Sequence, residues 1–116
     1  MDVARMEAQL REGGAEFQRS LFTLREIEYC SAKRYPARHF AARFAAKEAF
    51  FKAFGAGGHQ GFPWREVEIG NDEQGKPFVT LYGSLEAKAR ERGVKALHVS
   101  LSHTRELAMA QLAVES

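Results

Sequence analysis

The stretch from Arg43 to Gly55, with the sequence RFAAKEAFFKAFG, constrains the fold of this chain more than any other. It is rich in Ala, Lys, Glu and Arg and contains neither proline nor a β-branched residue, a composition typical of an α-helix. Gly55 follows at a natural C-terminal stop. At about 100° per residue, one narrow stripe of this helix collects the phenylalanines Phe40, Phe44, Phe51 and Phe54. We therefore predict a central helix over residues 37–54 whose Phe stripe lies in the core.

Helical patterns also occupy the chain before this central helix. Val3, Met6 and Leu10 recur at helical spacing and predict a first helix that runs to about residues 13–14, with a second short helical piece near residues 17–22. Thr23 and Glu26 form a capping-box pattern, in which each side chain satisfies a free amide at a helix start. A further helix is therefore expected from this point to just before residue 36.

After the glycine-rich stretch 55–61, the hydrophobic period changes from helical to alternating. We predict strands near residues 66–69 and 78–82, joined by a turn over 71–75, and two last strands over 97–101 and 107–114. Ser84 is the predicted cap of a helix that runs through Arg92 and stops at Gly93. Helices early and strands late indicate an α+β fold with a mainly antiparallel sheet around the central helix.

Composition limits the class of protein. A chain of 116 residues that is 45% hydrophobic predicts one domain over residues 1–116. No apolar run is long enough to span a membrane, so no membrane partner is expected. The single cysteine, Cys30, fits a reducing cytoplasm and a passive thiol. A nucleic-acid module would place stacking aromatics on an exposed basic face, whereas these phenylalanines lie on a stripe predicted to be buried, so no nucleic-acid partner is expected.

Two polar residues of the central helix are candidates for chemistry. Glu48 projects from the edge of the Phe stripe, and Lys52 stands one turn later on the same side. A carboxylate against an apolar wall is a candidate ligand for a hard cation or a candidate proton acceptor, and the lysine could hold a phosphate. The spacing alone equally describes an ordinary Glu–Lys helix pair, which is the commoner case.

The amino-acid sequence of this helix resembles the signature helix of the holo-[acyl-carrier-protein] synthases, in the 4′-phosphopantetheinyl transferase superfamily. Gly75-Lys76-Pro77 and the segment 98–104, HVSLSHT, look like the other two landmarks of that family, in the same order. The resemblance implies a fold of that family and transfer of the phosphopantetheine arm of coenzyme A to a serine of acyl carrier protein, in fatty-acid synthesis. It also implies Mg²⁺ as cofactor and a homotrimer with a site at each subunit interface.

The resemblance assigns roles to particular residues. Glu48 becomes a metal ligand and, with Lys52, a catalytic residue. Residues that contact coenzyme A are then Lys52, Arg43, Lys47, Lys76, Ser102, His103 and Thr104, although a structural salt bridge is a serious rival reading for Lys47. The last three residues would touch the adenosine phosphates, and Lys76 would approach the nucleotide. Arg5 and Arg11 are the candidate docking residues for the acidic carrier protein.

One departure from the family concerns the start of the chain. Family members open with a strand that ends in Gly-x-Asp, and this Asp is the second metal ligand. If Arg5 matches the family's docking arginine, the aspartate falls before Met1, and this chain lacks the strand and the ligand. A looser alignment makes Asp2 the ligand and leaves the docking arginine unmatched. We prefer the first alignment, because its spacing from Arg5 to Lys47 matches the family without gaps, and under it either the start of the chain is assigned too far downstream or this form is truncated. A missing ligand keeps a second hypothesis open, a non-catalytic subunit that binds coenzyme A or a nucleotide.

Overall fold

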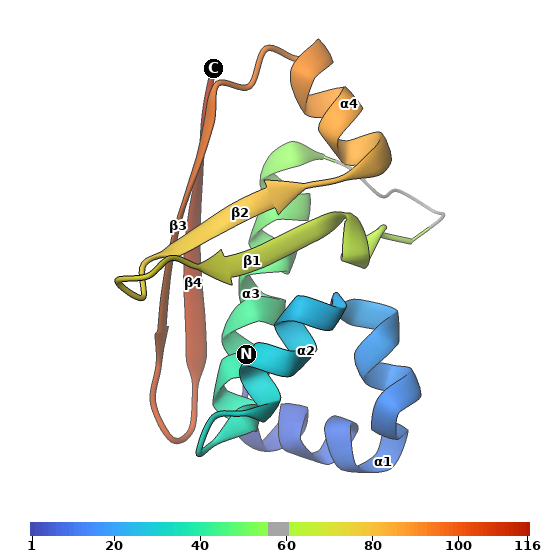
Figure 1. Ribbon diagram of the computed structural model, residues 1–116, viewed down its shortest axis with the longest axis vertical. Helices are drawn as coiled ribbons and strands as arrows, with labels where there is room; N and C mark the ends of the chain where they lie inside the picture. The colour runs from blue at the N-terminus through green and yellow to red at the C-terminus, as the bar shows by residue number, and fades with distance from the viewer. Residues whose placement is uncertain (56–60) are drawn as a thin grey trace.

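The computed structural model describes residues 1–55 and 61–116, so most of the predicted glycine-rich loop lies outside the described residues. Helices come first and strands last (Figure 1), which confirms the predicted α+β class. The elements in chain order are α1 (Val3–Leu21), α2 (Leu24–Ser31), α3 (Pro36–Phe54), the 3₁₀ turn η2 (Trp64–Glu66), β1 (Val67–Asn71), β2 (Pro77–Leu81), α4 (Gly83–Glu91), β3 (Ala96–His103) and β4 (Ala108–Glu115). No described helix has both the length and the apolar character required to cross a membrane.

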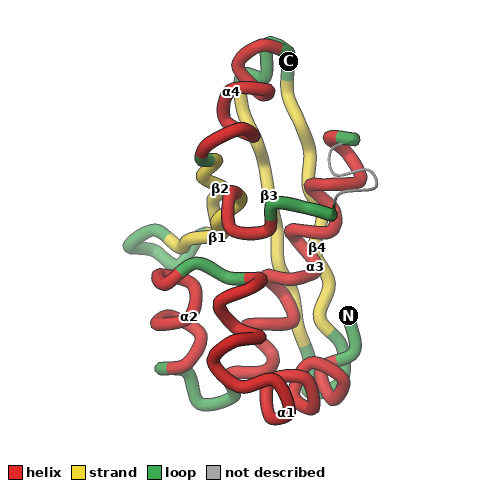
Figure 2. Tube along the Cα trace, turned by 90° about the vertical axis from the view of Figure 1, so that its right-hand side faces the viewer, coloured by secondary structure: helices red, strands yellow, loops and turns green. Residues whose placement is uncertain are grey.

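The central helix α3 organises the molecule, as the sequence predicts. It begins with Pro36, whose missing N–H is not needed in a first turn, and it ends at Gly55 in the left-handed conformation with φ 67°. On one side α3 packs against α1 and α2, and on the other it runs along the β3–β4 hairpin (Figures 1 and 2). The elements α1, α2, β1, β3 and β4 therefore all pack against this helix.

The aromatic core is wider than the predicted Phe stripe. Phe40, Phe51 and Phe54 are buried as expected, whereas Phe44 is half-buried and stacks on Trp64 at 5.2 Å between ring centroids. Phe50, outside that stripe, is fully buried as well. Because α3 is covered by helices on one side and strands on the other, its apolar surface extends around more of the circumference than a single stripe.

The two helical pieces predicted before residue 23 form one bent element. Gly14, at φ 58° and ψ −149°, breaks the helical conformation inside α1. The next helix, α2, opens with the predicted capping box: the Glu26 amide donates to the Thr23 hydroxyl, and the Thr23 amide donates to the Glu26 carboxylate at 2.8 Å. This box fixes the start of α2 and also places Glu26 beside α3.

The strands form two antiparallel pairs. β1 pairs with β2 from Val67↔Leu81 to Asn71↔Pro77, and β3 pairs with β4 from Ala96↔Glu115 to His103↔Ala108. The backbone of Met1 lies beside the start of β4, where Met1 and Ala108 exchange hydrogen bonds of 2.8 and 2.9 Å. The predicted antiparallel arrangement is thus confirmed, in two ladders rather than one sheet.

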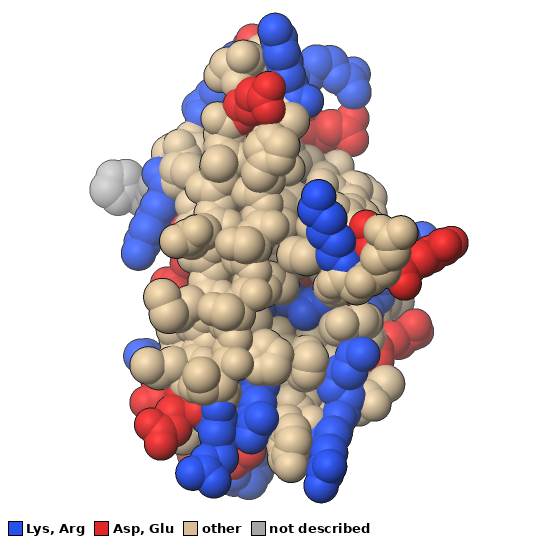
Figure 3. Space-filling model, turned by 90° about the vertical axis from the view of Figure 1, so that its left-hand side faces the viewer, with Lys and Arg blue, Asp and Glu red and all other residues tan. Residues whose placement is uncertain are grey.

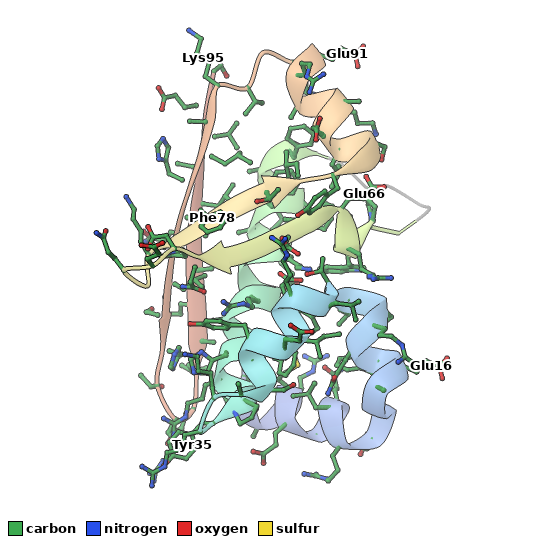
Figure 4. The ribbon with its side chains drawn as sticks, viewed as in Figure 1. Glu16, Tyr35, Glu66, Phe78, Glu91 and Lys95 are labelled. Carbon is green, nitrogen blue, oxygen red and sulfur yellow. The ribbon has the colours of Figure 1, made fainter. Side chains whose placement is uncertain are left out.

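The cap of α4 differs from the prediction. The helix begins at Gly83, and Ser84 does not cap it with its own side chain. Instead the carboxylate of Glu66 lies against the start of α4 (Figure 4) and accepts hydrogen bonds from the Ser84 hydroxyl at 2.7 Å and the Leu85 amide at 2.9 Å. These bonds also lower the pKa of Glu66. A cap supplied from a distant element leaves no local signal in the sequence.

Candidate active site

Glu48 and Lys52 lie one turn apart on α3. Glu48 is half-buried and Lys52 is exposed. Among the described residues no ion pair joins them, and no hydrogen bond reaches either side chain, so the ordinary Glu–Lys pair is not formed. A carboxylate and an ammonium one turn apart are therefore free to meet a cation and a phosphate.

A cavity of about 210 Å³ lies on the opposite side of α3. It brings together three segments that the sequence singled out: Arg43 of the central helix, the Gly75-Lys76-Pro77 turn and His103 of the last hairpin. The residues that line it are Tyr29, His39, Ala42, Arg43, Asn71, Gly75, Pro77, Leu101 and His103. Segments far apart in the sequence thus converge on one basic, aromatic cavity.

Arg43 supplies the buried charge of this cavity. Its side chain is almost fully enclosed, its guanidinium lies 4.2 Å from the centre of the Tyr29 ring, and one terminal nitrogen donates to the Asn71 side chain. The Nε–H is buried and has no partner among the described residues. Arg43 also lines a second cavity of about 180 Å³ beside the first. A buried guanidinium with an unused donor is suited to an anion such as phosphate.

His39 is the cavity residue that the sequence analysis missed. Its ring packs edge-to-face against His103, at 4.8 Å between centroids, and against Tyr29 at 6.0 Å. Burial, followed by the nearby His103 and Arg43, lowers the pKa of His39 to about 4. A signal was present, because His39 precedes Arg43 by four residues and residues at that spacing share a face of a helix.

The other residues predicted near the nucleotide do not all reach this cavity. Ser102 points away from it, because neighbouring side chains of a strand alternate between faces and His103 lines the cavity. The Thr104 hydroxyl accepts from the amides of Glu106 and Leu107 at 3.2 and 3.1 Å and thereby closes the β3–β4 turn. Lys76 is exposed at the tip of the hairpin, beside residues that do line the cavity. Of the predicted Ser-His-Thr group, only the imidazole faces the cavity.

Lys47 is a structural residue, which corrects its predicted contact with phosphate. Its side chain is fully buried, and Nζ donates to Glu26 Oε1 at 2.6 Å and to the carbonyls of Leu21 and Trp64 at 2.7 and 3.0 Å. An ammonium has three N–H donors, and all three are used inside the protein. Burial lowers the pKa of Lys47, and the Glu26 carboxylate opposes that shift. The rival reading of Lys47 as a salt-bridge partner is the one that the structure supports.

A polar network continues from this ion pair into the strands. Glu26 also accepts from the Ile69 amide at 2.9 Å, and the Thr23 hydroxyl donates to Glu68 at 2.6 Å. Tyr82 donates to the second oxygen of Glu68 at 2.9 Å. The network ties α2, α3 and β1 together, so it holds the helix that carries Glu48 in a fixed position.

The remaining candidates lie on α1 or beside it. Arg5 and Arg11 are both exposed. Asp2 is the N-cap of α1, where its carboxylate accepts from the Arg5 amide at 3.2 Å. Figure 3 shows Lys and Arg gathered at the lower end of one face, below a largely uncharged surface over β3 and β4. Within residues 1–55 and 61–116, no three His, Cys, Asp or Glu side chains are grouped as a metal site.

Comparison with known proteins places the chain in a family. The model of the 4′-phosphopantetheinyl transferase superfamily matches residues 1–113, and the chain belongs to this superfamily. It is 42% identical to the holo-[acyl-carrier-protein] synthase of Syntrophus aciditrophicus over 115 residues, which are 99% of this chain and 90% of that protein. A Geobacter protein of the same name is 43% identical over 115 residues, with 99% of this chain and 92% of the relative covered.

Solved structures agree with the sequence relatives. The crystal structure of holo-[acyl-carrier-protein] synthase from Neisseria meningitidis matches all of this chain and 93% of that one, with a TM-score of 0.87 and 28% identity. The Bacillus anthracis synthase, in complex with CoA (3′,5′-ADP), matches all of this chain and 90% of its own, with a TM-score of 0.79 and 29% identity. The predicted family and fold are therefore confirmed.

Proposed function

We propose that this protein is a holo-[acyl-carrier-protein] synthase, which transfers the 4′-phosphopantetheine arm of coenzyme A to a serine of acyl carrier protein. The names of its relatives and the coenzyme A complex of the Bacillus anthracis synthase support this proposal. The observation that carries it is the pair of Glu48 and Lys52 on α3, whose side chains no described residue engages, together with a basic cavity at Arg43 and His103 in a chain of this superfamily.

In this reaction the serine Oγ forms a bond to the β-phosphorus of coenzyme A, next to the pantetheine arm. The bond from that phosphorus to the bridging oxygen breaks, adenosine 3′,5′-bisphosphate leaves, and the hydroxyl proton is released. Charge grows on the leaving phosphate, so a positioned cation lowers the barrier. Lys52, exposed at the end of α3, is the residue of this chain that we assign to the diphosphate.

The residues present fit a magnesium ion that arrives with its substrate. Mg²⁺ keeps several waters and commonly takes one or two protein carboxylates together with substrate phosphates. Glu48 offers one half-buried carboxylate that no described residue engages, whereas the Asp2 carboxylate caps α1. Glu48 would hold the ion, which would supply charge neutralisation at the diphosphate.

The cavity of Arg43 and His103 suits the adenosine end of coenzyme A. The 3′-phosphate is a monoester and carries up to two negative charges, whereas each phosphorus of the diphosphate carries one. A buried guanidinium whose Nε–H has no partner among the described residues, together with the imidazoles of His39 and His103, offers nitrogen donors to the dianion. We therefore assign the 3′-phosphate to this cavity.

The two half-sites face opposite ways, which supports a site shared between copies of the chain. At about 100° per residue, Glu48 stands about 180° around α3 from His39 of the cavity. Helices and strands pack along α3, and we infer that a ligand bound to one copy does not reach both sides. A neighbouring copy that contributes its cavity to the Glu48 side completes the site, and the homotrimer of the family is the assembly we propose.

Partners and location belong to the same proposal. Exposed Arg5 and Arg11 on α1 would meet the acidic carrier protein, because opposite charges steer association.

The lone cysteine, Cys30, is buried and its pKa is raised to about 12, so it is an inert thiol. We place the protein in the cytoplasm and its product in fatty-acid synthesis.

One assay tests the proposal against its rival. The protein is incubated with apo acyl carrier protein, coenzyme A and Mg²⁺, and the carrier is weighed by mass spectrometry. A mass increase equal to one phosphopantetheine is expected, and it should disappear when Mg²⁺ is chelated. Binding of coenzyme A by calorimetry without any mass increase would instead establish the non-catalytic subunit.

A further inference from the structure

Three rings line the adenosine-phosphate cavity in a continuous row. Tyr29 of α2 packs edge-to-face on His39 of α3, and His39 packs edge-to-face on His103 of β3. His39 is half-buried in the middle of this row and lines the same 210 Å³ cavity as Arg43. His39 thus stands between Tyr29 and His103, and the proposed function counts it only as one of the two imidazoles that line the cavity.

The side chains that act on the charge of His39 are basic. His103 acts on it from β3, Arg43 and Arg38 from its own helix, and Lys33 from the turn before that helix. The neighbours from α2 and from the β1–β2 hairpin that share the cavity, Tyr29 and Asn71, are uncharged. Burial, followed by these basic residues, lowers the pKa of His39 to about 4, so its ring is neutral at physiological pH.

A phosphate dianion in the cavity reverses this electrostatic balance. Its two negative charges offset the field of Arg43 and give His39 an opposite charge at short range, which favours the protonated ring. We propose that His39 takes up one proton from solvent when the 3′-phosphate of coenzyme A enters the cavity, and so becomes a cationic contact only in the complex. This inference rests on the proposed function, because it requires a coenzyme A phosphate beside Arg43 and His103.

The size of the effect follows from proton linkage. If bound phosphate only restores the pKa of His39 from about 4 to its ordinary 6.5, the complex gains about three-quarters of a proton at pH 6. The same shift tightens coenzyme A binding about fourfold at pH 6 relative to pH 8, over and above any titration of the ligand itself. A larger shift in the complex increases both quantities.

Isothermal titration calorimetry measures this proton directly. Coenzyme A is titrated into the intact protein at pH 6 in two buffers with different ionisation enthalpies, and the difference in heat gives the protons taken up. His39→Phe keeps an aromatic ring between Tyr29 and His103 but cannot be protonated. His98→Phe is the matched control, because His98 is an exposed histidine of β3 that pairs with Glu115 outside the cavity.

We expect wild type and His98→Phe to take up about three-quarters of a proton more than His39→Phe. Dephospho-coenzyme A, which lacks the 3′-phosphate, should abolish this difference. Equal proton uptake by wild type and His39→Phe, with coenzyme A still bound, overturns the role of His39 and leaves the proposed function standing. No binding of coenzyme A by wild type overturns the function and the inference together.

A measurement on the wild-type protein covers the case in which His39→Phe does not fold. The ring proton signals of His39 are followed by NMR from pH 4 to pH 8, with and without adenosine 3′,5′-bisphosphate. The inference requires the pKa of His39 to rise when this ligand binds. An unchanged titration curve for His39 in the presence of bound ligand overturns it.

Discussion

Mixing two inactive variants tests how the site is divided between copies of the chain. Glu48→Gln keeps the size of the side chain and removes the charge that a hard cation needs, so transfer should fall by orders of magnitude. His103→Glu places a carboxylate in the cavity where we assign the 3′-phosphate. Loss of one hydrogen bond to a charged group costs about 1.5–3 kcal/mol, or about 10- to 140-fold, and repulsion adds to this loss.

Co-expression of the two variants in equal amounts should restore activity. If each site takes Glu48 from one copy and the cavity from the next, half of the carboxylates and half of the cavities are wild type. Random assembly then makes about one quarter of the sites intact. The assay is the rate of holo-carrier formation at a coenzyme A concentration below KM, followed by mass spectrometry, with each variant alone and with wild type as references.

The control is a mixture of Glu48→Gln with Lys52→Ala, two changes on the same side of α3. Every copy in that mixture carries a defect in the same half-site, so no intact site can form. A mixture of Glu48→Gln and His103→Glu that stays at the activity of its parents would refute the shared site. In that case Glu48 and the cavity of one and the same copy act together on the substrate.

The remaining predictions concern the metal, the carrier, the core and the first turn. Glu48→Gln should weaken the response of transfer to Mg²⁺ while circular dichroism stays unchanged; equal activity at limiting Mg²⁺ would remove Glu48 from the metal site. Arg5→Ala should raise KM for the carrier more than KM for coenzyme A. Added salt should reduce the difference in carrier KM between wild type and Arg5→Ala, because exposed charges are screened. Equal rises in both KM values would point to a folding defect. Lys47→Met leaves the buried Glu26 unpaired and should cost about 3–5 kcal/mol in urea unfolding, and a loss below about 1 kcal/mol would contradict this account of the pair. Asp2→Asn should leave transfer nearly unchanged, because Asn caps a helix as well as Asp does, whereas abolished transfer would make Asp2 a metal ligand.

Local patterns predicted most of the fold, because their physical causes are local. The capping box at Thr23 needs only residues three apart, and the end of α3 needs only a glycine that adopts a positive φ. The break near Gly14 has the same origin. The cap of α4 could not be predicted, since it comes from Glu66, a residue on the far side of the β1–β2 hairpin.

The candidate site residues also fall into two groups: those placed by local sequence spacing and those placed only by tertiary structure. Glu48 and Lys52 share one helix, and their spacing alone places them on one face. The cavity instead depends on where β3 lies against α3, and this decides that His103 faces Arg43 while Ser102 faces away. Membership of the family implied all three residues of the Ser-His-Thr segment together, whereas strand alternation separates them.

Lys47 shows why charge on a helix is hard to interpret without tertiary structure. In sequence it stands between Ala46 and Glu48, and a helix projection puts it near the aromatic stripe. An ammonium at that position either turns outward to solvent or finds enough oxygens inside, and the sequence does not show which. The oxygens that enclose it come from the end of α1, from α2 and from η2, three elements that meet only in the folded chain. Lys47 thus fixes the helix, while its neighbour Glu48, which no described residue engages, is left to the substrate.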